Sequence, residues 1–221
     1  MPQATQPKVL VTQFADGSSV DPRACRDGSA GVQDTHARYL EAVARGNVYS
    51  ACTPVAGCAP GTALGTALSL CLYNPLNSGV GLSVWKVSWA YVSGTLGAGN
   101  IVYCTNNVAG AQAGTVPTGT AMVARNNQIG NGSTPKGLAL SAATVVTTSA
   151  TGILRPVWSI FPVLATTAIL PAPMIDEVAG EYEVLPGNIF GAHEIGGAGT
   201  SPLGCWGICW EEYPIAVSNI G

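Results

Sequence analysis

Residues 82–93 read Leu-Ser-Val-Trp-Lys-Val-Ser-Trp-Ala-Tyr-Val-Ser. Successive side chains of a strand point to opposite faces, so this spacing predicts a strand with two different faces. One face carries Trp85, Val87, Trp89 and Tyr91, and the other carries Lys86, Ser88, Ala90 and Val92. We expect the aromatic stripe to fill a core.

The same period of two recurs along the chain. Residues 67–73 set Leu68, Leu70 and Leu72 against Ser69, Cys71 and Tyr73, and residues 203–213 set Trp206, Ile208 and Trp210 against Cys205, Gly207 and Cys209. Further strands are expected at 47–53, 100–105, 120–125, 143–148, 155–162, 181–185 and 189–195, and the segment 82–105 resembles a hairpin. Many short strands separated by turns predict an all-β fold, either a β-sandwich or a closed barrel.

The first 45 residues follow a different pattern. Residues 1–33 read as an extended arm, and 34–45 is the best helix candidate. Asp34 suits the N-cap of this helix, and Gly46 suits the left-handed position just past its end. We therefore expect an N-terminal arm with a short helix over 1–45, followed by a β-sandwich domain over 46–221.

Charge is distributed unevenly. Residues 46–175 carry only Lys86, Arg125, Lys136 and Arg155, and no acid. Residues 176–221 carry seven acids and no base: Asp176, Glu177, Glu181, Glu183, Glu194, Glu211 and Glu212. A soluble protein with so little charge usually hides surface against other subunits. The acids are then either ordinary charged loops or partners of the body's bases across a subunit contact.

The composition argues against two classes of partner. The formal net charge is −3 and no basic cluster occurs, so nucleic acid is not expected as a partner. Two apolar windows, 138–154 and 156–175, are interrupted by Ser and Thr or by four prolines, which argues against a membrane span. The first ten residues lack the basic and apolar regions of a secretory signal.

Seven cysteines are present: Cys25, Cys52, Cys58, Cys71, Cys104, Cys205 and Cys209. An odd number cannot all pair within one chain. Cys205 and Cys209 lie too far apart on one strand to bridge each other, whereas Cys52 and Cys58 could close a small loop. Buried free thiols and at least one disulfide both remain open, and no C-x₂-C pair favours zinc.

No pattern singles out an active site. His36 and His193 lack a metal-ligand neighbour, because Glu194 points the other way on a strand. A Ser-His-Asp arrangement stays open, but no G-x-S-x-G motif supports one. Asp176-Glu177 and Glu181-x-Glu183 fit either the paired carboxylates of a glycosidase or charges that protect a sheet edge. We predict no catalytic, cofactor-binding or metal-binding residue and no cofactor, and we expect no enzyme.

Several strand-and-turn segments resemble those of small structural proteins of tailed bacteriophages, the capsid cement or decoration proteins. They are Ala44-Arg-Gly-Asn-Val-Tyr-Ser50, Tyr91-Val-Ser-Gly-Thr-Leu-Gly-Ala-Gly-Asn-Ile-Val102, Gly199-Thr-Ser-Pro-Leu203 and Trp210-Glu-Glu-Tyr-Pro-Ile215. The resemblance implies a jelly-roll fold and a homotrimer on the outer surface of the virion capsid. It also implies synthesis in the host cytoplasm and the major capsid protein as partner. The alternatives are a receptor- or carbohydrate-binding β-sandwich module of a head fibre or tail, and a glycan hydrolase.

Deleting residues 1–33 tests the expected role of the arm. We expect attachment to the capsid to weaken more than the stability of the sandwich, because an extended arm adds contacts outside the core. Particle binding and thermal unfolding of the truncated chain measure the two effects. Loss of folding would instead place the arm in the core.

Overall fold

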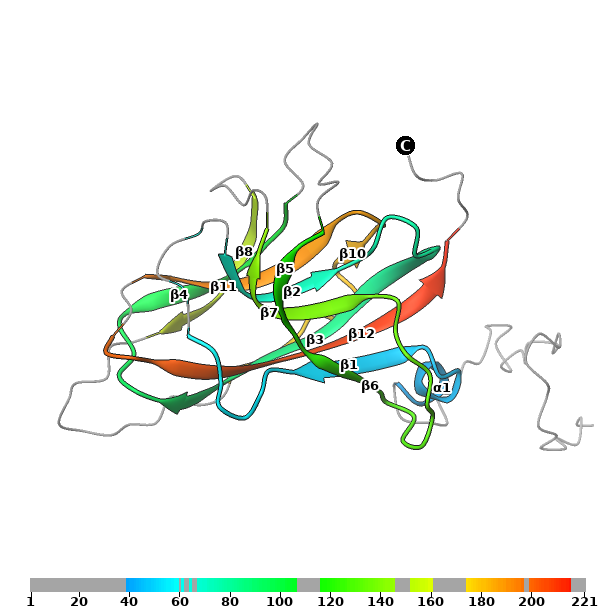
Figure 1. The fold of residues 1–221 in the computed structure, drawn as a ribbon, viewed down its shortest axis with the longest axis horizontal. Helices are drawn as coiled ribbons and strands as arrows, with labels where there is room; N and C mark the ends of the chain where they lie inside the picture. The colour runs from blue at the N-terminus through cyan, green and yellow to red at the C-terminus, as the bar shows by residue number, and fades with distance from the viewer. Residues whose placement is uncertain are drawn as a thin grey trace, which may run out of the picture. The chain divides into compact units, whose positions relative to one another are not determined.

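The computed structural model describes residues 39–59, 61, 64, 67–106, 116–145, 152–160, 174–196 and 199–215. The chain divides into two compact units, 1–38 and 39–221, and all described residues belong to the second. The predicted arm, 1–33, lies outside the described residues. The second unit consists of two antiparallel sheets that form two layers (Figure 1), so the predicted all-β sandwich is confirmed.

Each sheet has six strands. The first sheet has the order β10-β3-β12-β1-β6, with β9 pairing to the same edge of β3 as β10. Its strands are β1 (Val48–Cys52), β3 (Val80–Ser93), β6 (Val123–Asn126), β9 (Met174–Glu177), β10 (Glu183–Val184) and β12 (Leu203–Pro214). The second sheet has the order β5-β7-β2-β11-β4-β8. Its strands are β2 (Ala67–Tyr73), β4 (Gly99–Cys104), β5 (Thr118–Ala121), β7 (Leu138–Thr144), β8 (Ile153–Ile160) and β11 (Ile189–Gly196).

The core lies between the sheets and is built on β12. Its alternate residues Trp206, Ile208 and Trp210 are buried, while the residues between them are half-buried. The predicted stripe on this strand is therefore confirmed. These three side chains pair with Trp89, Val87 and Val84 of β3, and the rings of Trp89 and Trp206 meet edge to face at 6.5 Å. Leu70, Leu72 and Phe190 complete the core from the second sheet.

A second apolar cluster covers part of the other face of the second sheet. It contains Leu68, Cys71, Tyr73, Cys104, Leu140, Ala143, Val145 and Ile189. Strand β2 is therefore buried on both faces, which explains why six of its seven residues are buried and none is charged. Leu70 and Leu72 face the central core and Cys71 and Tyr73 the second cluster, as the alternation predicts. Leu68 lies in the second cluster instead of on the face of Leu70 and Leu72, so this part of the prediction is wrong.

Trp85 does not share the face of Val87 and Trp89, so this part of the prediction is wrong. The pairing of β3 with β12 shifts by one residue between Cys209 and Trp210, which pair with Lys86 and Val84. Trp85 is the extra residue of this β-bulge, and a bulge reverses the phase of the alternation. Its half-buried ring packs against Tyr39 at 4.9 Å instead of entering the core.

The predicted hairpin over 82–105 is also wrong, because β3 and β4 lie in different sheets. One edge of β3 is occupied by β12 along its whole length, and the other edge pairs with β9 and β10. The residues after β3 must therefore cross to the second sheet. Gly94, with a φ of +86°, and the hydrogen bond from Thr95 N–H to the carbonyl of Thr200 begin this crossing.

The predicted strand at 120–125 is two strands that belong to different sheets. β5 ends at Ala121 in the second sheet, and β6 begins at Val123 in the first. Met122 between them is buried in the core, so the chain passes from one layer to the other here (Figure 1). β7 begins at Leu138, five residues before its predicted start, and β9 falls where no strand was predicted.

The helix that the structure describes is α1 (Leu40–Ala44), which is shorter than the predicted helix over 34–45. Asp34 lies outside the described residues. Tyr39 occupies the N-cap position and makes no capping hydrogen bond with its side chain. Gly46 has a φ of +75°, so the predicted left-handed residue after the helix is confirmed.

Glu212 ties the loop before β7 to the central strand β12. Its buried carboxylate accepts hydrogen bonds from the backbone N–H groups of Lys136 (2.9 Å) and Gly137 (2.8 Å) and from Nε1 of Trp210 (3.2 Å). A buried carboxylate needs such donors, because an unpaired one loses its hydration without compensation.

We expect Glu212→Ala to lower the free energy of unfolding by about 3 kcal/mol, because three buried N–H donors lose their acceptor. The matched control is Glu211→Ala, whose carboxylate accepts one part-buried hydrogen bond, from Asn47. The control should cost less than about 1 kcal/mol. Urea unfolding of both variants measures the difference, and equal losses would contradict this assignment.

Candidate functional site

The outward face of the first sheet holds a row of five residues without a charge. Directly opposite residues of antiparallel strands point to the same side of a sheet. The register places Ile175, Ser88, Gly207, Cys52 and Val123 side by side across β9, β3, β12, β1 and β6. Ala90 and Cys205 form the next pair on the same face. We call these seven residues the uncharged face.

The uncharged face is open to solvent where its large side chains lie. The exposed fraction is 68% for Ile175 and 66% for Val123, and Ala90 and Cys52 are also exposed. Ser88, Gly207 and Cys205 are half-buried in the middle of the sheet. The surface is therefore flat, with small residues at its centre and β-branched residues at its rims.

Charges appear in the neighbouring row, where they are partly matched. That row consists of Glu177, Lys86, Cys209, Ser50 and Arg125 across the same five strands. Nζ of Lys86 lies 3.1 Å from Oε1 of Glu177 and 4.8 Å from the ring centre of Tyr39. An exposed pair of this kind adds little stability, but it neutralises the edge of the face.

A second ionic group closes the edge between the two sheets. Arg155 on β8 of the second sheet reaches Asp176 on β9 of the first, with Nη2 2.9 Å from Oδ2, and Glu181 at 3.3 Å. The hydroxyl of Tyr103 donates to the same Asp176 oxygen at 2.8 Å. Burial, together with this hydrogen bond, raises the pKa of Tyr103. These contacts of Arg155, Asp176, Glu181 and Tyr103, which we call the clasp, join the two sheets.

These contacts show which acids pair with two of the bases of residues 46–175. Lys86 and Arg155 pair with Glu177, Asp176 and Glu181 of the same chain. The hypothesis that such pairs form across a subunit contact is wrong for these residues, because the fold brings β9 beside β3 and β8. Asp176 and Glu181 both form a salt bridge with the guanidinium group of Arg155.

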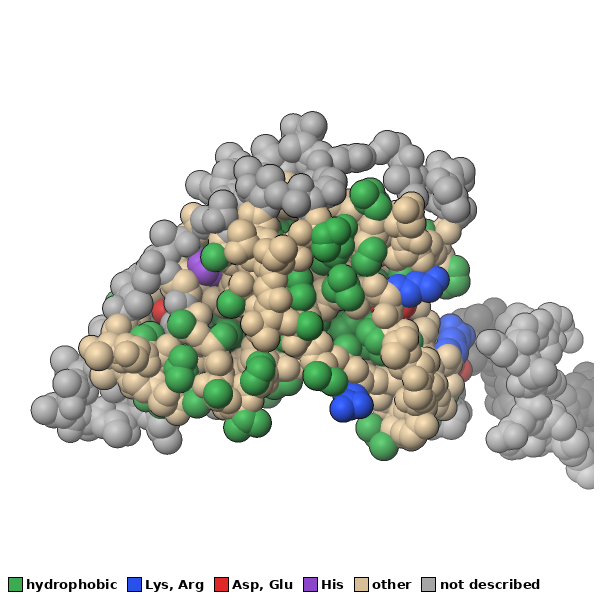
Figure 2. Space-filling model, in the orientation of Figure 1, with side chains coloured by type: hydrophobic (Ala, Val, Ile, Leu, Met, Phe, Trp, Pro, Cys, Tyr) green, Lys and Arg blue, Asp and Glu red, His purple; other side chains and the backbone are tan. Residues whose placement is uncertain are grey.

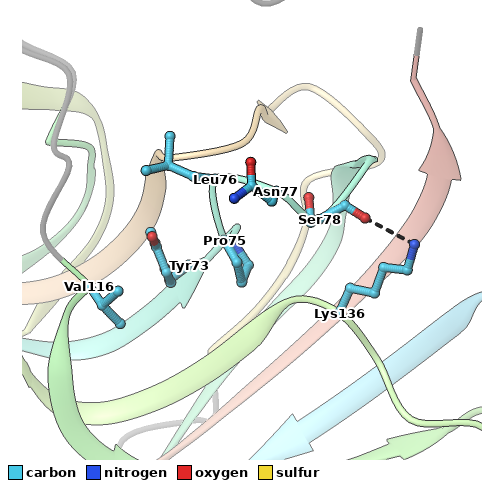
Figure 3. Close-up of a pocket in the computed structure, with 7 residues that line it drawn as sticks. All are labelled: Tyr73, Pro75, Leu76, Asn77, Ser78, Val116 and Lys136. Atoms are coloured by element: carbon cyan, nitrogen blue, oxygen red, sulfur yellow. Dashed lines mark hydrogen bonds between the residues drawn. The ribbon is translucent and has the colours of Figure 1, made fainter. Parts of the chain in front are cut away.

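Hollows at the margins of the sandwich include two that are lined by described residues. The larger, of about 520 Å³, lies beside the turn after β2 and is lined by Tyr73, Pro75, Leu76, Asn77, Ser78, Val116 and Lys136. Figure 3 shows the Lys136 amine directed to the Ser78 carbonyl oxygen, 2.9 Å away, which leaves Tyr73, Leu76 and Val116 around the hollow. The smaller, of about 280 Å³, is lined by Thr105, Leu154, Tyr182, Glu183, Val184, Ile189 and Phe190.

Figure 2 shows hydrophobic and uncharged side chains over most of one face of the molecule, with few charges.

Ser69 and His193 meet on the outer face of the second sheet, a contact that the sequence did not reveal. Nδ1 of His193 lies 3.3 Å from Oγ of Ser69 and accepts a hydrogen bond from the Ser69 N–H at 3.2 Å. Both side chains are buried, and Glu194 faces the opposite side of β11, across from Ile101 of the core. The pair therefore lacks an orienting acid from Glu194 and an open surface. His36 lies outside the described residues.

The described cysteines are all free thiols: Cys52, Cys58, Cys71, Cys104, Cys205 and Cys209. Cys71 and Cys104 are buried, and burial raises their pKa. Cys52 and Cys58 do not close a loop in this state. Cys25 lies outside the described residues.

Glu194 is a buried carboxyl group in the interior of the sandwich. Its Oε2 has no hydrogen-bond partner in the part of the chain that the structure describes. Burial raises the pKa of Glu194 to about 7. The group is therefore protonated in mildly acidic solution and ionises near neutral pH.

The remaining comparisons are negative. Among the described residues, no group of three or more His, Cys, Asp or Glu side chains has the geometry of a metal site. No helix in the described ranges is long and apolar enough to cross a membrane. No protein-family model, curated protein or solved structure matches the chain.

The raised pKa of Glu194 predicts a pH-dependent stability. The native state holds this proton up to about pH 7, whereas the unfolded state releases it near 4.5. The contribution of Glu194 to the free energy of unfolding is therefore fully present below pH 4.5. It falls by about 3 kcal/mol as the pH rises from there through 7. Glu194→Gln should remove this loss. Urea unfolding at pH 5 and pH 8 measures it, and parallel profiles of the two proteins would contradict it.

Proposed function

We propose that this protein is a capsid decoration protein of a tailed bacteriophage. It binds the outer surface of the phage head as a trimer and stabilises contacts between major capsid subunits. It is made in the host cytoplasm and belongs to the virion. It acts through its surfaces rather than by catalysis.

The order of the strands supports a jelly roll. Eight strands give the order β1-β12-β3-β9 in the first sheet and β2-β11-β4-β8 in the second. Along the chain, this set moves between the sheets at every step except from β4 to β8, as in the double-sheet fold with two Greek keys that many viral capsid proteins share. Strands β5, β6 and β7 extend the sheets at the side of β1 and β2.

The uncharged face carries the proposal. A protein that joins two capsid subunits must bury a large surface, about 2,000 Å² or more for a stable assembly. Burying a charge costs free energy unless it is paired, whereas Ile175, Ala90 and Val123 lose no strong hydration. The pairing of Lys86 with Glu177 within the chain leaves little charge at the β9 edge. This face therefore suits a broad contact with another protein.

The second candidate is a β-sandwich module that binds a receptor or carbohydrate, and the smaller hollow favours it. Tyr182 and Glu183 line this hollow, and aromatic rings beside acids are common in sugar sites. However, Phe190 in the same hollow is buried, and Trp89, Trp206 and Trp210 all face the core. Few aromatic rings thus remain for a sugar to stack on, so we place this function second.

Purified protein should bind phage heads that lack it and raise their resistance to heat or low salt. We expect Ala90→Glu to weaken this binding about tenfold or more, because a charge would be buried in the contact. Ala121→Glu is the matched control, since Ala121 is an exposed strand residue of the second sheet. Cosedimentation with particles measures binding, and thermal unfolding shows that both variants fold.

Three outcomes distinguish the two candidate functions. Binding lost in Ala90→Glu but kept in the control supports the proposal. Equal binding of both variants would show that the uncharged face is not the contact. Failure of the unmodified protein to bind heads, together with binding to a glycan array that Tyr182→Ala abolishes, would replace this function by the second candidate.

A further inference from the structure

Two thiols lie side by side on the uncharged face. Cys52, the last residue of β1, pairs with Gly207 of β12, and Cys205 lies two residues before Gly207 on the same side of the sheet. Such a diagonal position puts the two Cα atoms about 7–8 Å apart with the Cβ atoms somewhat closer, so two short side chains meet only where they turn toward each other. Cys52 is exposed and Cys205 is half-buried, so both remain accessible from the same surface.

The sulfur of Cys205 lies against the chain that continues from Cys52. It accepts a hydrogen bond from Oγ1 of Thr53 at 3.4 Å and donates to the carbonyl oxygen of Pro54 at 3.5 Å. Thr53 N–H also bonds to the Trp206 carbonyl oxygen, so the two strands stay together beyond Cys52. Burial raises the pKa of Cys52, and a hydrogen bond between its thiol and that of Cys205 adds to this effect. This interaction indicates that the two thiols turn toward each other across the strands.

The other nearby thiols have different partners. Cys58 pairs with Gly204 in an isolated bridge, and its sulfur donates to the carbonyl oxygen of Ser69 in the second sheet. Burial raises its pKa to about 11. The sulfur of Cys209 accepts a hydrogen bond from Nδ2 of Asn127 at 3.3 Å, and Cys209 lies four residues from Cys205 on one extended strand. Neither of them is placed as well as Cys52 to meet Cys205.

We propose that Cys52 and Cys205 form a reversible disulfide within the chain when the protein meets a disulfide oxidant. This bridge would join β1 to β12 at the end of the uncharged face. It is a modification of the free-thiol state that the structure shows.

The chemistry is a thiol–disulfide exchange with a small disulfide such as oxidised glutathione. The thiolate of Cys52, the more exposed residue, attacks one sulfur and releases one glutathione thiolate. The thiolate of Cys205 then attacks the sulfur of Cys52 and releases the second. Each released thiolate takes up one of the two protons that the cysteines lose. The two cysteines are oxidised by two electrons, and the glutathione disulfide is reduced to two thiols.

The bridge connects two strands that are distant along the chain. A disulfide that closes a long loop restricts the unfolded state, which raises the melting temperature by about 5–10 °C for a protein of this size. A protein made in a reducing compartment and then released would acquire this bridge only after release. That last step depends on the proposed function, whereas closure of the bridge does not.

The test uses the full chain in glutathione buffers of increasing oxidising strength, followed by trapping of free thiols with iodoacetamide. We expect the intact mass measured before trapping to fall by about two hydrogens on oxidation, and peptide mapping of the trapped protein to join Cys52 to Cys205. Cys52→Ser and Cys205→Ser should not form the bridge, whereas Cys58→Ser and Cys209→Ser should form it as the wild type does. Oxidation should raise the melting temperature of the wild type and of Cys209→Ser but not of Cys52→Ser.

Other results would overturn the proposal. These are stable mixed disulfides with glutathione alone, a bridge that includes Cys58 or Cys209, or no loss of free thiols in the most oxidising glutathione buffer. Failure to bind phage heads would leave this result unaffected, because the bridge is measured on the isolated protein. The two proposals can therefore fail separately.

Discussion

The pairing of β3 with β12 is the constraint on which the rest of the sandwich depends. These two strands are the longest in the described structure, and they pair along their whole length. Their inward side chains bring together Trp89, Trp206 and Trp210, which contribute much of the buried apolar area of the first sheet. The outer edge of each strand then selects a different neighbour: β1 joins β12, and β9 and β10 join β3.

Because both edges of β3 are occupied, the chain cannot return beside it and must cross to the other layer. The chain crosses between the layers again at the short strands β5 and β6, which belong to different sheets although only Met122 separates them. The clasp of Arg155 with Asp176 and Glu181 follows from this topology as well, since it brings an edge of each sheet to the same place. One of the four bases of residues 46–175, Arg155, thus lies where the layers meet.

The sequence predicted the elements whose period of two is uninterrupted. β12 and β2 were located to within one residue, since the sequence of each alternates, although Leu68 of β2 packs in the second cluster instead of with Leu70 and Leu72. It failed where the structure departs from a regular period or depends on distant partners. The bulge at Trp85 reverses the alternation, and nothing in the local sequence shows it. The pairing partner of β3 lies about 120 residues away, so local turn residues favoured the wrong neighbour. The contacts of Cys52 with Cys205 and of Ser69 with His193 depend on register in the same way, and spacing along the chain does not reveal them.

The edges and the open face of the first sheet differ in a way that directs association. An exposed edge strand offers unpaired N–H and C=O groups to any other strand, and charged residues on it oppose such pairing. Here β6 carries Arg125, and the opposite edge carries the pair of Lys86 with Glu177 and the clasp of Arg155. The uncharged face between these edges has no such protection. The charged edges thus oppose strand pairing, and the uncharged face remains as the surface through which the proposed binding would occur.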